Sequence, residues 1–342
     1  MDASLSNTRM LAFDSRWIGP HGIGRFAAEI QRRLALRDWS LAGSPSSPLD
    51  PLRLTLAMGK LPRDGVVFSP GYNPPLWPVR PFVFTVHDLN HLDVSNNSSA
   101  SKRLYYRLVI RRACHTARKV LTVSEFSRRR IIEWAGVKPE QVVCVGNGVD
   151  ASFSPDGARY DPGFSYLLMV SNRRAHKNEE RALAAFAQAR IDPSIRLLMT
   201  GLPTNALQGL IGNLGLTKRV VFLGRVEDAQ LPLVYRGALG LLFPSLYEGF
   251  GLPVVEAMAS GIPVLTSTVT ALPEVAGDAA LLVNPVDVDA IASGIDKMLT
   301  DAALCERLRL AGLRRAAMFQ WDEVAARVNR VLEEISLRGV GP

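Results

Sequence analysis

The feature that most constrains this chain is a repeated alternation of short apolar runs with segments of helical periodicity. Runs such as 65–71 (GVVFSPG) and 82–88 (FVFTVHD) are mostly apolar and are closed by polar or glycine residues, which is typical of buried parallel strands. Segments such as 102–119 and 178–190 repeat apolar residues with the period of a helix. Strands that alternate with helices predict an α/β fold built on parallel sheets.

The alternation is interrupted once, at residues 151–163 (ASFSPDGARYDPG), which carry several glycine and proline breaks and no periodicity. A chain of 342 residues is also long for a single core. We therefore expect two doubly wound parallel-sheet domains, at 1–155 and 160–320, followed by a terminal helical segment at 321–342. Ligands of such sheets bind beyond the carboxyl ends of the strands, so the cleft between two facing domains is the expected site.

Charge is distributed unevenly between the two halves. Residues 1–150 hold 21 Lys and Arg against 12 Asp and Glu, whereas the remainder holds 19 against 20. The excess is greatest in 101–130, where ten basic residues accompany one acidic residue, Glu125. Such an asymmetry indicates an anionic partner for the first domain: a nucleic acid, an anionic membrane or a phosphorylated substrate.

Cysteine usage and hydropathy favour a cytoplasmic protein. The three cysteines, Cys114, Cys144 and Cys305, are odd in number and far apart, which excludes a disulfide framework and a zinc ribbon. No apolar stretch is long enough to span a membrane, and the first ten residues lack the apolar core of a signal peptide.

Two glutamates, Glu248 and Glu256, flank a glycine-rich turn in the segment SLYEGFGLPVVEAMASGIPV. Gly249 and Gly251 allow the backbone to approach a ligand closely, and Pro253 suits the first turn of a helix. Free amides at a helix start attract a diphosphate, and a carboxylate matches the two hydroxyls of a ribose. The helix dipole alone also favours an acidic residue in a first turn, so both interpretations stay open on these grounds.

The segment 245–284 closely resembles the signature of the retaining glycosyltransferases of family 4, which have the GT-B fold. Further stretches follow in the family's order: GIGRF, VHD, TVSEFSRRRI, NGVD, HKN and VVFLGRVED. The resemblance covers nearly the whole chain. It implies two Rossmann-like domains facing across a cleft, the first binding the acceptor and the second the nucleotide-sugar donor. It also implies a last helix, at 324–336, that crosses back onto the N-terminal domain.

The resemblance assigns a role to each residue of the motif. Glu256 would hold the ribose hydroxyls of a nucleotide sugar, and Glu248 would lie beside the donor sugar. The turn would face sugar and phosphate through four donor-binding residues: Gly249, Phe250, Gly251 and Leu252. In the family the leaving diphosphate helps to deprotonate the incoming hydroxyl, without a metal or a firmly established protein nucleophile. The protein then contributes positioning and charge stabilisation.

The stretch VSNRRAHKN (170–178) supplies the expected cations. Lys177 matches the family lysine that binds the donor diphosphate, a role that suits a compact cation. Ser171 stands where relatives often have glycine, and His176 where many have arginine. Arg173 or Arg174 would then supply the second cation, with Arg173 the first choice; a solvated basic loop is the alternative.

Three residues of the N-terminal half are also assigned to the site. Gly22 and Gly24, in GPHGIGRF, belong to a glycine turn that opens a helix and suits a place near phosphate or acceptor. A lone histidine is more often structural than catalytic, but His87 lies at the carboxyl end of a predicted strand. Relatives with the same His-Asp pair place the histidine against the donor sugar, whereas Asp88 is expected to stabilise its loop.

The pair Asp287 and Asp289 resembles the Asp-x-Asp metal motif of other glycosyltransferases. Here it precedes a helical segment, AIASGI, so helix capping explains it, and no metal is expected.

The basic segment 102–119 places Arg103, Arg107 and Arg111 at four-residue steps, which predicts one face of a helix. Leu104, Tyr105 and Leu108 supply another face. We expect contact with an anionic membrane that carries a lipid-linked acceptor; a solvated helix is the alternative. Nucleic acid is disfavoured because no recognised binding motif is present.

The chain most resembles bacterial mannosyl- or rhamnosyltransferases of polysaccharide assembly. The expected reaction moves a hexose, with mannose favoured, from GDP-mannose to a saccharide acceptor, for instance one linked to polyprenyl diphosphate at the inner face of the cell membrane. Alternatives are a transferase that uses dTDP-rhamnose or a UDP-sugar, a retaining phosphorylase or hydrolase with Glu248 and Glu256 as its carboxylates, and a non-catalytic nucleotide-sugar-binding protein.

Overall fold

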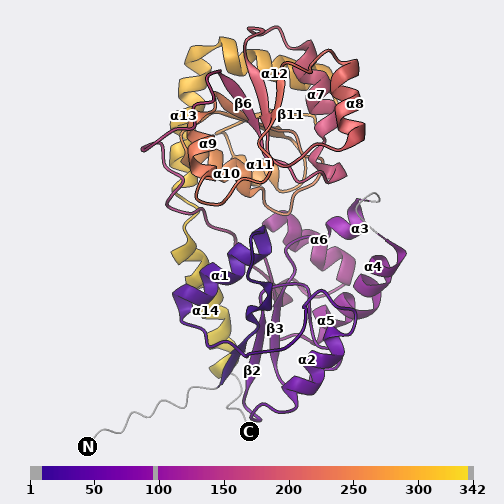
Figure 1. The fold of residues 1–342 in the computed structure, drawn as a ribbon. Helices are drawn as coiled ribbons and strands as arrows, with labels where there is room; N and C mark the ends of the chain where they lie inside the picture. The colour runs from indigo at the N-terminus through magenta and orange to yellow at the C-terminus, as the bar shows by residue number, and fades with distance from the viewer. Residues whose placement is uncertain (1–9, 95–98, 338–342) are drawn as a thin grey trace, which may run out of the picture. The chain divides into compact units, whose positions relative to one another are not determined.

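The computed structural model describes residues 10–94 and 99–337, which form two compact units (Figure 1). Unit 1 contains the residues up to Asp93, residues 99–147 and the segment that begins at Trp321. Unit 2 is built by the continuous segment from Gly148 to Gln320. The chain therefore passes from unit 1 into unit 2 and returns to unit 1 with its last helix.

Unit 1 holds a five-stranded parallel sheet in the order β1-β2-β3-β4-β5. Its strands are β1 (Leu11–Phe13), β2 (Val66–Ser69), β3 (Phe82–Thr85), β4 (Lys119–Thr122) and β5 (Val142–Cys144). Its helical segments are η1 (Ser15–Trp17), α1 (Gly22–Leu34), α2 (Asp50–Met58), α3 (Asn90–Asp93), α4 (Ala100–Tyr105), η3 (Tyr106–Ile110), α5 (Arg111–Thr116), α6 (Glu125–Ala135), η4 (Pro139–Gln141) and α14 (Trp321–Leu337). The strand order runs in one direction without a reversal.

Unit 2 holds a six-stranded parallel sheet in the order β11-β10-β9-β6-β7-β8. Its strands are β6 (Tyr166–Met169), β7 (Arg196–Met199), β8 (Val220–Phe222), β9 (Gly240–Phe243), β10 (Val264–Ser267) and β11 (Leu281–Val283). Its helical segments are η5 (Ala175–Lys177), α7 (Glu179–Gln188), α8 (Asn205–Asn213), α9 (Leu231–Gly237), α10 (Leu252–Ala259), α11 (Leu272–Ala276), α12 (Val288–Thr300) and α13 (Ala302–Ala316). The predicted class, α/β with two parallel sheets, is confirmed.

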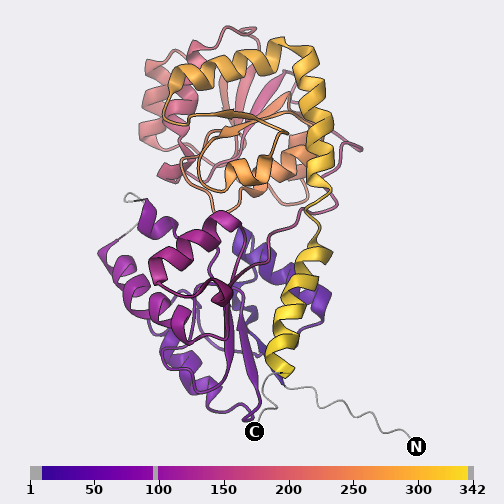
Figure 2. The ribbon, with the colours of Figure 1, turned by 180° about the vertical axis from the view of Figure 1, so that it is seen from behind.

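Helices cover both faces of the sheet in unit 1. One face packs against α1 and α14, with Phe26, Ile30, Trp321 and Val328 buried in a shared apolar core. Figure 2 shows α14, in yellow, running beside α1. The other face packs against α2, η3, α5 and α6 in a second core. Each strand is therefore buried from both sides, which explains why the strands read as unbroken apolar runs.

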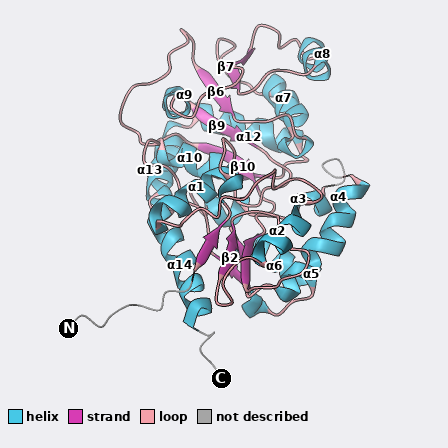
Figure 3. Ribbon diagram, turned by 60° about the horizontal axis from the view of Figure 1, so that its bottom comes forward, coloured by secondary structure: helices cyan, strands magenta, loops and turns pink. Residues whose placement is uncertain are grey.

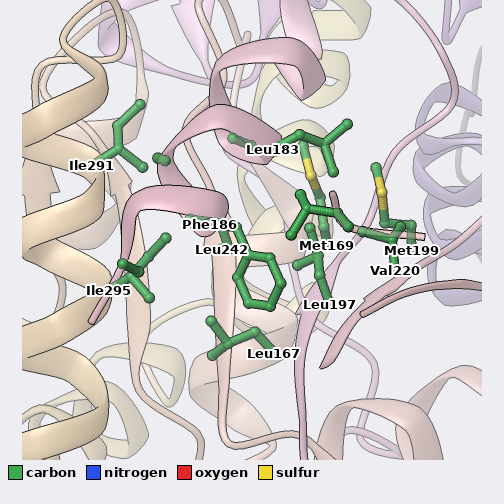
Figure 4. Close-up of a cluster of buried hydrophobic side chains, with 14 of the residues drawn as sticks. Leu167, Met169, Leu183, Phe186, Leu197, Met199, Val220, Leu242, Ile291 and Ile295 are labelled. Carbon is green, nitrogen blue, oxygen red and sulfur yellow. The ribbon is translucent and has the colours of Figure 1, made fainter. Parts of the chain in front are cut away.

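In unit 2, one face of the sheet packs against α7, α8 and α12. Phe186 of α7 lies among Leu167, Leu242 and Ile295 (Figure 4), and all four are fully buried. An aromatic ring with such surroundings anchors the helix, because truncating a buried Phe to Ala costs about 3–5 kcal/mol. This rigid core fixes the loops that leave the carboxyl ends of the strands.

Local sequence signals set the helix ends. Ser124 caps α6 by accepting the amide of Ser127 at 3.0 Å, and Gly136 ends that helix with a φ of 71°. Asp287 caps α12 by accepting the amide of Ala290 at 2.9 Å. The capping explanation of the Asp-x-Asp pair therefore agrees with the structure.

Candidate functional site

The strand order of unit 2 reverses between β6 and β9, which are neighbours in the sheet. The sheet grows from β6 through β7 to β8 and, in the opposite direction, from β9 through β10 to β11. Loops that leave two such strands diverge, and ligands of open α/β sheets bind at this switch point. The segment 170–178 follows β6 and the segment 244–251 follows β9. Both motif-bearing loops of unit 2 therefore start at the switch point.

The two loops meet through an ion pair between Lys177 and Glu248. The Lys177 Nζ lies 2.6 Å from the Glu248 Oε1, and the two side chains are only 12% and 13% exposed. The ammonium also lies 4.8 Å from the centre of the Phe243 ring, at the end of β9. A cation and a carboxylate are thus held side by side at the edge of the sheet, where both keep some access to solvent.

Asn178, which was not among the predicted site residues, holds the first loop in place. Its side-chain amide donates to the carbonyls of Pro244, at 2.9 Å, and Pro285, at 2.6 Å. Its φ of 59° lies in the left-handed region, which asparagine tolerates better than most residues. The amide of Leu246 adds a bond of 2.7 Å to the His176 carbonyl. The position of Lys177 is therefore fixed from both sides.

The glycine turn leads directly into α10. Gly251 has a φ of 102°, and a Cβ at this position would lie 2.7 Å from the Leu272 Cδ2, so a side chain is excluded by conformation and by space. Gly249 is buried. Phe250 is also buried, with its ring edge against Phe319 at 5.5 Å between centroids. Leu252, the first residue of α10, is half-buried. Phe250 can therefore offer a ligand its backbone but not its ring.

Glu256 is buried one turn inside α10. Its Oε2 accepts a hydrogen bond of 2.8 Å from the hydroxyl of Tyr235, which is itself fully buried on α9. No motif in the sequence singled out Tyr235, because its apolar neighbours predict only a helix. The two glutamates therefore have different surroundings: Glu248 pairs with a cation, and Glu256 with a phenol.

The guanidinium of Arg173 is bound within unit 2. It pairs with Glu179 and donates to the carbonyls of Thr200 and, at 2.9 Å, Leu202. Arg174 is exposed and forms no ion pair in the part of the chain that the structure describes. The guanidinium of Arg174 is therefore more available to a ligand than that of Arg173. A donor contact by Arg173 stays a prediction.

His87 follows β3 in unit 1 and is buried. Its Nε2 lies 2.9 Å from the carbonyl oxygen of Pro70, which fixes the proton on that nitrogen. The imidazole stands edge-on to Phe26, at 5.2 Å, and 5.9 Å from the Tyr72 ring. Burial lowers the pKa of His87 to about 4, and the charge of His21 acts in the same direction. The imidazole is therefore neutral at neutral pH.

The predicted glycine turn of unit 1 is partly helical. Gly22 and Gly24 lie in the first turn of α1, which is capped by His21 through a bond of 2.9 Å from the Gly24 amide to the ring Nδ1. A Cβ at Gly24 would collide with the backbone of Gly19. Packing alone therefore explains why residue 24 is a glycine, whereas Gly22 is exposed.

Unit 1 also contains a buried charge network that no sequence motif indicated. Asp14 and Asp50 are fully buried, and Arg16 bridges them with contacts of 2.7 Å and 2.6 Å. Asn73 donates to both carboxylates at 2.8 Å and 3.0 Å and accepts from the Trp17 indole. Burial acts to lower the pKa of Arg16, but the bonds and charges of the two carboxylates outweigh it and raise that pKa.

The basic segment 102–119 is not one regular helix. A π-helical turn, η3, separates α4 from α5 and adds a residue to that turn. Arg103, Arg107 and Arg111 are all exposed, and their place on one face stays a prediction. Arg111 also donates from its Nε to the carbonyl of Ala135, at 3.3 Å. Leu104 and Leu108 are exposed, whereas Tyr105 is half-buried and donates from its hydroxyl to the Tyr72 carbonyl at 3.1 Å.

Residues 10–94 and 99–337 contain no group of three His, Cys, Asp or Glu side chains that could hold a metal ion. No helix among them is long and apolar enough to cross a membrane. Residues 1–9, which belong to the stretch expected to lack the apolar core of a signal peptide, lie outside the described residues.

Family models match both units of the chain. Residues 12–153 match "Glycosyltransferase Family 4", and residues 157–315 match "Glycosyl transferases group 1". The chain belongs to the retaining glycosyltransferases of family 4. The resemblance read from the motifs is therefore confirmed.

Curated members of the family include bacterial mannosyltransferases. The O-antigen chain mannosyltransferase B of Escherichia coli is 31% identical over 254 residues, which cover 70% of this chain and 67% of that protein. The MMP alpha-(1->4)-mannosyltransferase of Mycolicibacterium hassiacum is 36% identical over 227 residues, 64% of this chain and 55% of that protein. The match with a serotype-specific mannosyltransferase of Escherichia coli spans only 27% of that relative.

Solved structures with the GT-B fold match nearly the full length. Sucrose-phosphate synthase from Thermosynechococcus elongatus gives a TM-score of 0.77 at 20% identity, covering 96% of this chain and 99% of that chain. HepE of Anabaena, in complex with UDP and glucose, gives 0.75 at 19% identity, covering 96% and 100%. At this identity the likeness establishes the fold alone.

Proposed function

We propose that the protein transfers a hexose, mannose in the favoured case, from a nucleoside-diphosphate sugar to a saccharide acceptor with retention of configuration. The observation that carries the proposal is the pair Lys177–Glu248 at the switch point of unit 2. A cation beside a carboxylate suits a donor that has a diphosphate next to a polyhydroxylated sugar. The named mannosyltransferase relatives favour GDP-mannose as donor and a cell-surface polysaccharide as product.

In this proposal unit 2 is the donor-binding domain. Lys177 neutralises the diphosphate, and Glu248 accepts hydroxyls of the donor sugar. Glu256 accepts the ribose hydroxyls, and the turn from Gly249 to Leu252 offers amides at the start of α10. The leaving diphosphate takes up the proton of the incoming hydroxyl, so the protein supplies position and charge stabilisation without a metal.

Unit 1 is the acceptor-binding domain in the same proposal. His87 follows β3 at the carboxyl edge of the sheet, and Gly22 and Gly24 lie in the first turn of α1. The neutral imidazole of His87 suits a hydroxyl group of the sugar better than a phosphate, because it brings no positive charge. The acceptor is a saccharide carried on a polyprenyl diphosphate, and the enzyme works in the cytoplasm on the inner face of the membrane. Nucleic acid is not a partner.

A second donor class is kept because of the structural neighbours. HepE of Anabaena is described with UDP, with UDP-glucose, and with UDP and glucose. The ribose and diphosphate contacts proposed for Glu256 and Lys177 do not depend on the base or the sugar. A UDP-sugar or dTDP-rhamnose would use the same contacts.

A thermal-shift screen tests the proposal directly. GDP, UDP and dTDP, each alone and as a sugar conjugate, are added to the purified chain, because a ligand of the native state raises the melting temperature. We expect the largest shift with GDP-mannose, and the same response in EDTA. Lys177→Ala should reduce kcat/KM about hundred- to thousandfold, the usual loss on removing one charge-stabilising contact.

The control is Lys218→Ala, a change at an exposed lysine of unit 2. Full activity of Lys177→Ala would remove this lysine from the site, and a strict need for Mn²⁺ would overturn the metal-free mechanism. No response to any nucleotide, together with no turnover, would contradict a nucleotide-sugar donor altogether.

A further inference from the structure

Helix α2 is apolar on both sides, although one side faces solvent. Leu54 and Met58 are buried against the sheet, whereas Leu52 and Leu56 are 41% and 64% exposed. Apolar residues on the outer side of a helix normally have a partner or lie in a lipid environment. This helix was not among the elements expected from the sequence, and it has no role in the proposed function.

The neighbouring segment enlarges the same exposed patch. Trp77 is 50% exposed and Val79 is 45% exposed. The amide of Trp77 donates to the Thr55 Oγ1, at 3.0 Å, and the amide of Leu76 donates to the Pro51 carbonyl, at 2.9 Å. These bonds hold the segment against α2. Large side chains of this kind are seldom exposed together on a monomeric protein without a partner.

The chain around this patch carries more cations than carboxylates. Residues 51–87 contain four basic residues and one acidic residue, the exposed Asp64, and residues 99–124 contain no Asp or Glu. Three exposed cations belong to the first stretch: Arg53, Lys60 and Arg63. An apolar patch surrounded by cations complements an anionic lipid surface, where Trp and Leu enter the interface and cations meet the headgroups.

The basic helices α4 and α5 belong to the same layer of unit 1. Met58 of α2, Ile110 of η3 and Ala113 of α5 are buried in one core beneath that layer. Figures 1 and 3 both show α2 beside α5 on that side of the sheet. The exposed side chains Leu104 and Leu108 thus extend outward from the same layer as Leu52 and Leu56.

We propose that this side of unit 1 docks on an anionic bilayer, with Leu52, Leu56, Trp77 and Val79 entering the headgroup region. These four residues, with Arg53, Lys60 and Arg63 beside them, are called the α2 face. The cations of α4 and α5 add attraction from the same layer. The inference rests on the proposed function only in that a lipid-linked acceptor gives the docking its purpose.

Vesicle sedimentation tests the α2 face. The full chain is mixed with vesicles of phosphatidylcholine alone or with phosphatidylglycerol added. Wild type should bind the anionic vesicles, and less so at high salt. The variant Leu52→Gln/Leu56→Gln/Trp77→Gln should bind at least tenfold more weakly. Each change of Arg53, Lys60 or Arg63 to Gln should cost about fivefold, from about 1 kcal/mol per cation near a charged surface.

The matched control is Leu310→Gln/Met318→Gln, which removes two exposed apolar side chains from the region of α13 in unit 2. It should bind vesicles as wild type does. Trp77 gives a second readout, because its fluorescence should shift to the blue with anionic vesicles and the shift should vanish in Trp77→Phe. Wild-type binding by the triple variant, or no blue shift, overturns the inference.

Two further measurements separate the possible explanations. Light scattering reports whether the α2 face joins two copies of the chain; a dimer that the triple variant abolishes would assign the face to self-association and overturn the lipid proposal. The thermal shift with GDP-mannose should be the same in wild type and triple variant. If wild type does not bind vesicles but still responds to GDP-mannose, the docking proposal is refuted and the donor proposal stands.

Discussion

The charged residues at the carboxyl edges of the two sheets have different surroundings. In unit 1, Asp14 and Asp50 are fully buried and Arg16 is 8% exposed between them. In unit 2, Lys177 and Glu248 form a single pair that stays in contact with solvent. The first group has protein partners on every side, whereas the second can still exchange partners with a ligand.

Topology accounts for the difference. The sheet of unit 1 runs from β1 to β5 in one direction, so the loops that leave adjacent strands do not diverge at a reversal. The sheet of unit 2 reverses between β6 and β9, and the pair Lys177–Glu248 spans that reversal. Charge at a strand end is therefore a weak sign of a ligand site until the strand order is known. With the order known, the network of unit 1 is expected to support the fold.

Removal of Arg16 should have the largest effect on stability. The change Arg16→Met leaves Asp14 and Asp50 buried without their cation, and breaking a buried pair in this way costs about 3–5 kcal/mol. The free energy of unfolding, measured in urea, should fall by that amount. The control, Arg63→Met, changes an exposed arginine of the same unit and should cost less than about 0.5 kcal/mol.

Equal stability of the two variants would mean that the buried network contributes nothing, and the contrast between the units would fail. The contrast becomes sharper if Arg16→Met keeps the nucleotide response of unit 2 at a temperature where it is still folded. The network then supports the structure of unit 1 and has no part in donor binding.

Most of the architecture could be predicted from the sequence, because parallel strands buried on both faces leave unbroken apolar runs. The turn before α10 was equally readable, since Gly251 and Pro253 have conformational requirements that few other residues meet. Asn178 and Tyr235 were missed for a different reason. Their roles arise from contacts with Pro244, Pro285 and Glu256 that lie far away along the chain, and no local pattern reports such contacts.

Elements with a weak sequence pattern were either not predicted or predicted to be more regular than they are. Helix α2 is short, begins at Asp50 with Pro51 next, and carries apolar residues on both its buried and its exposed side, so its sequence shows no clear helical period. The π-helical turn η3 leaves no pattern in the sequence that distinguishes it from an α-helical turn. In unit 1 the network of Asp14, Arg16 and Asp50 is hidden because its members look like ordinary surface residues.

His87 provides a test of burial in unit 1 through pH. Its pKa of about 4 lies below the ordinary value of about 6.5, so the unfolded chain takes up a proton before the folded chain does. The free energy of unfolding should therefore fall as the pH drops from 6.5 towards 4. Between pH 7 and pH 5 the loss due to His87 should be about 2 kcal/mol. His87→Gln should remove this part of the pH dependence in urea unfolding.

The control for this measurement is His115→Gln. His115 also bonds a backbone carbonyl, that of Ala135, at 2.9 Å, but its side chain is exposed. Its substitution controls for the loss of an imidazole from unit 1 as such. If both variants keep the wild-type slope, His87 is not buried as the structure describes.

The smallest expected effect concerns Glu256, which is the residue of unit 2 that most resembles the buried network of unit 1. If it holds a ribose, Glu256→Gln should weaken GDP about tenfold, or 1.4 kcal/mol, while inorganic pyrophosphate keeps its affinity through Lys177. Tyr235→Phe removes the hydrogen bond of 2.8 Å to the same carboxylate and should weaken GDP less than Glu256→Gln does. Calorimetric titration of both ligands into wild type and both variants measures these differences.

If instead both variants lose stability equally and neither changes the ratio of GDP to pyrophosphate affinity, Glu256 is part of the packing. A buried carboxylate would then support the structure in both units, and only Lys177 and Glu248 would distinguish the donor edge.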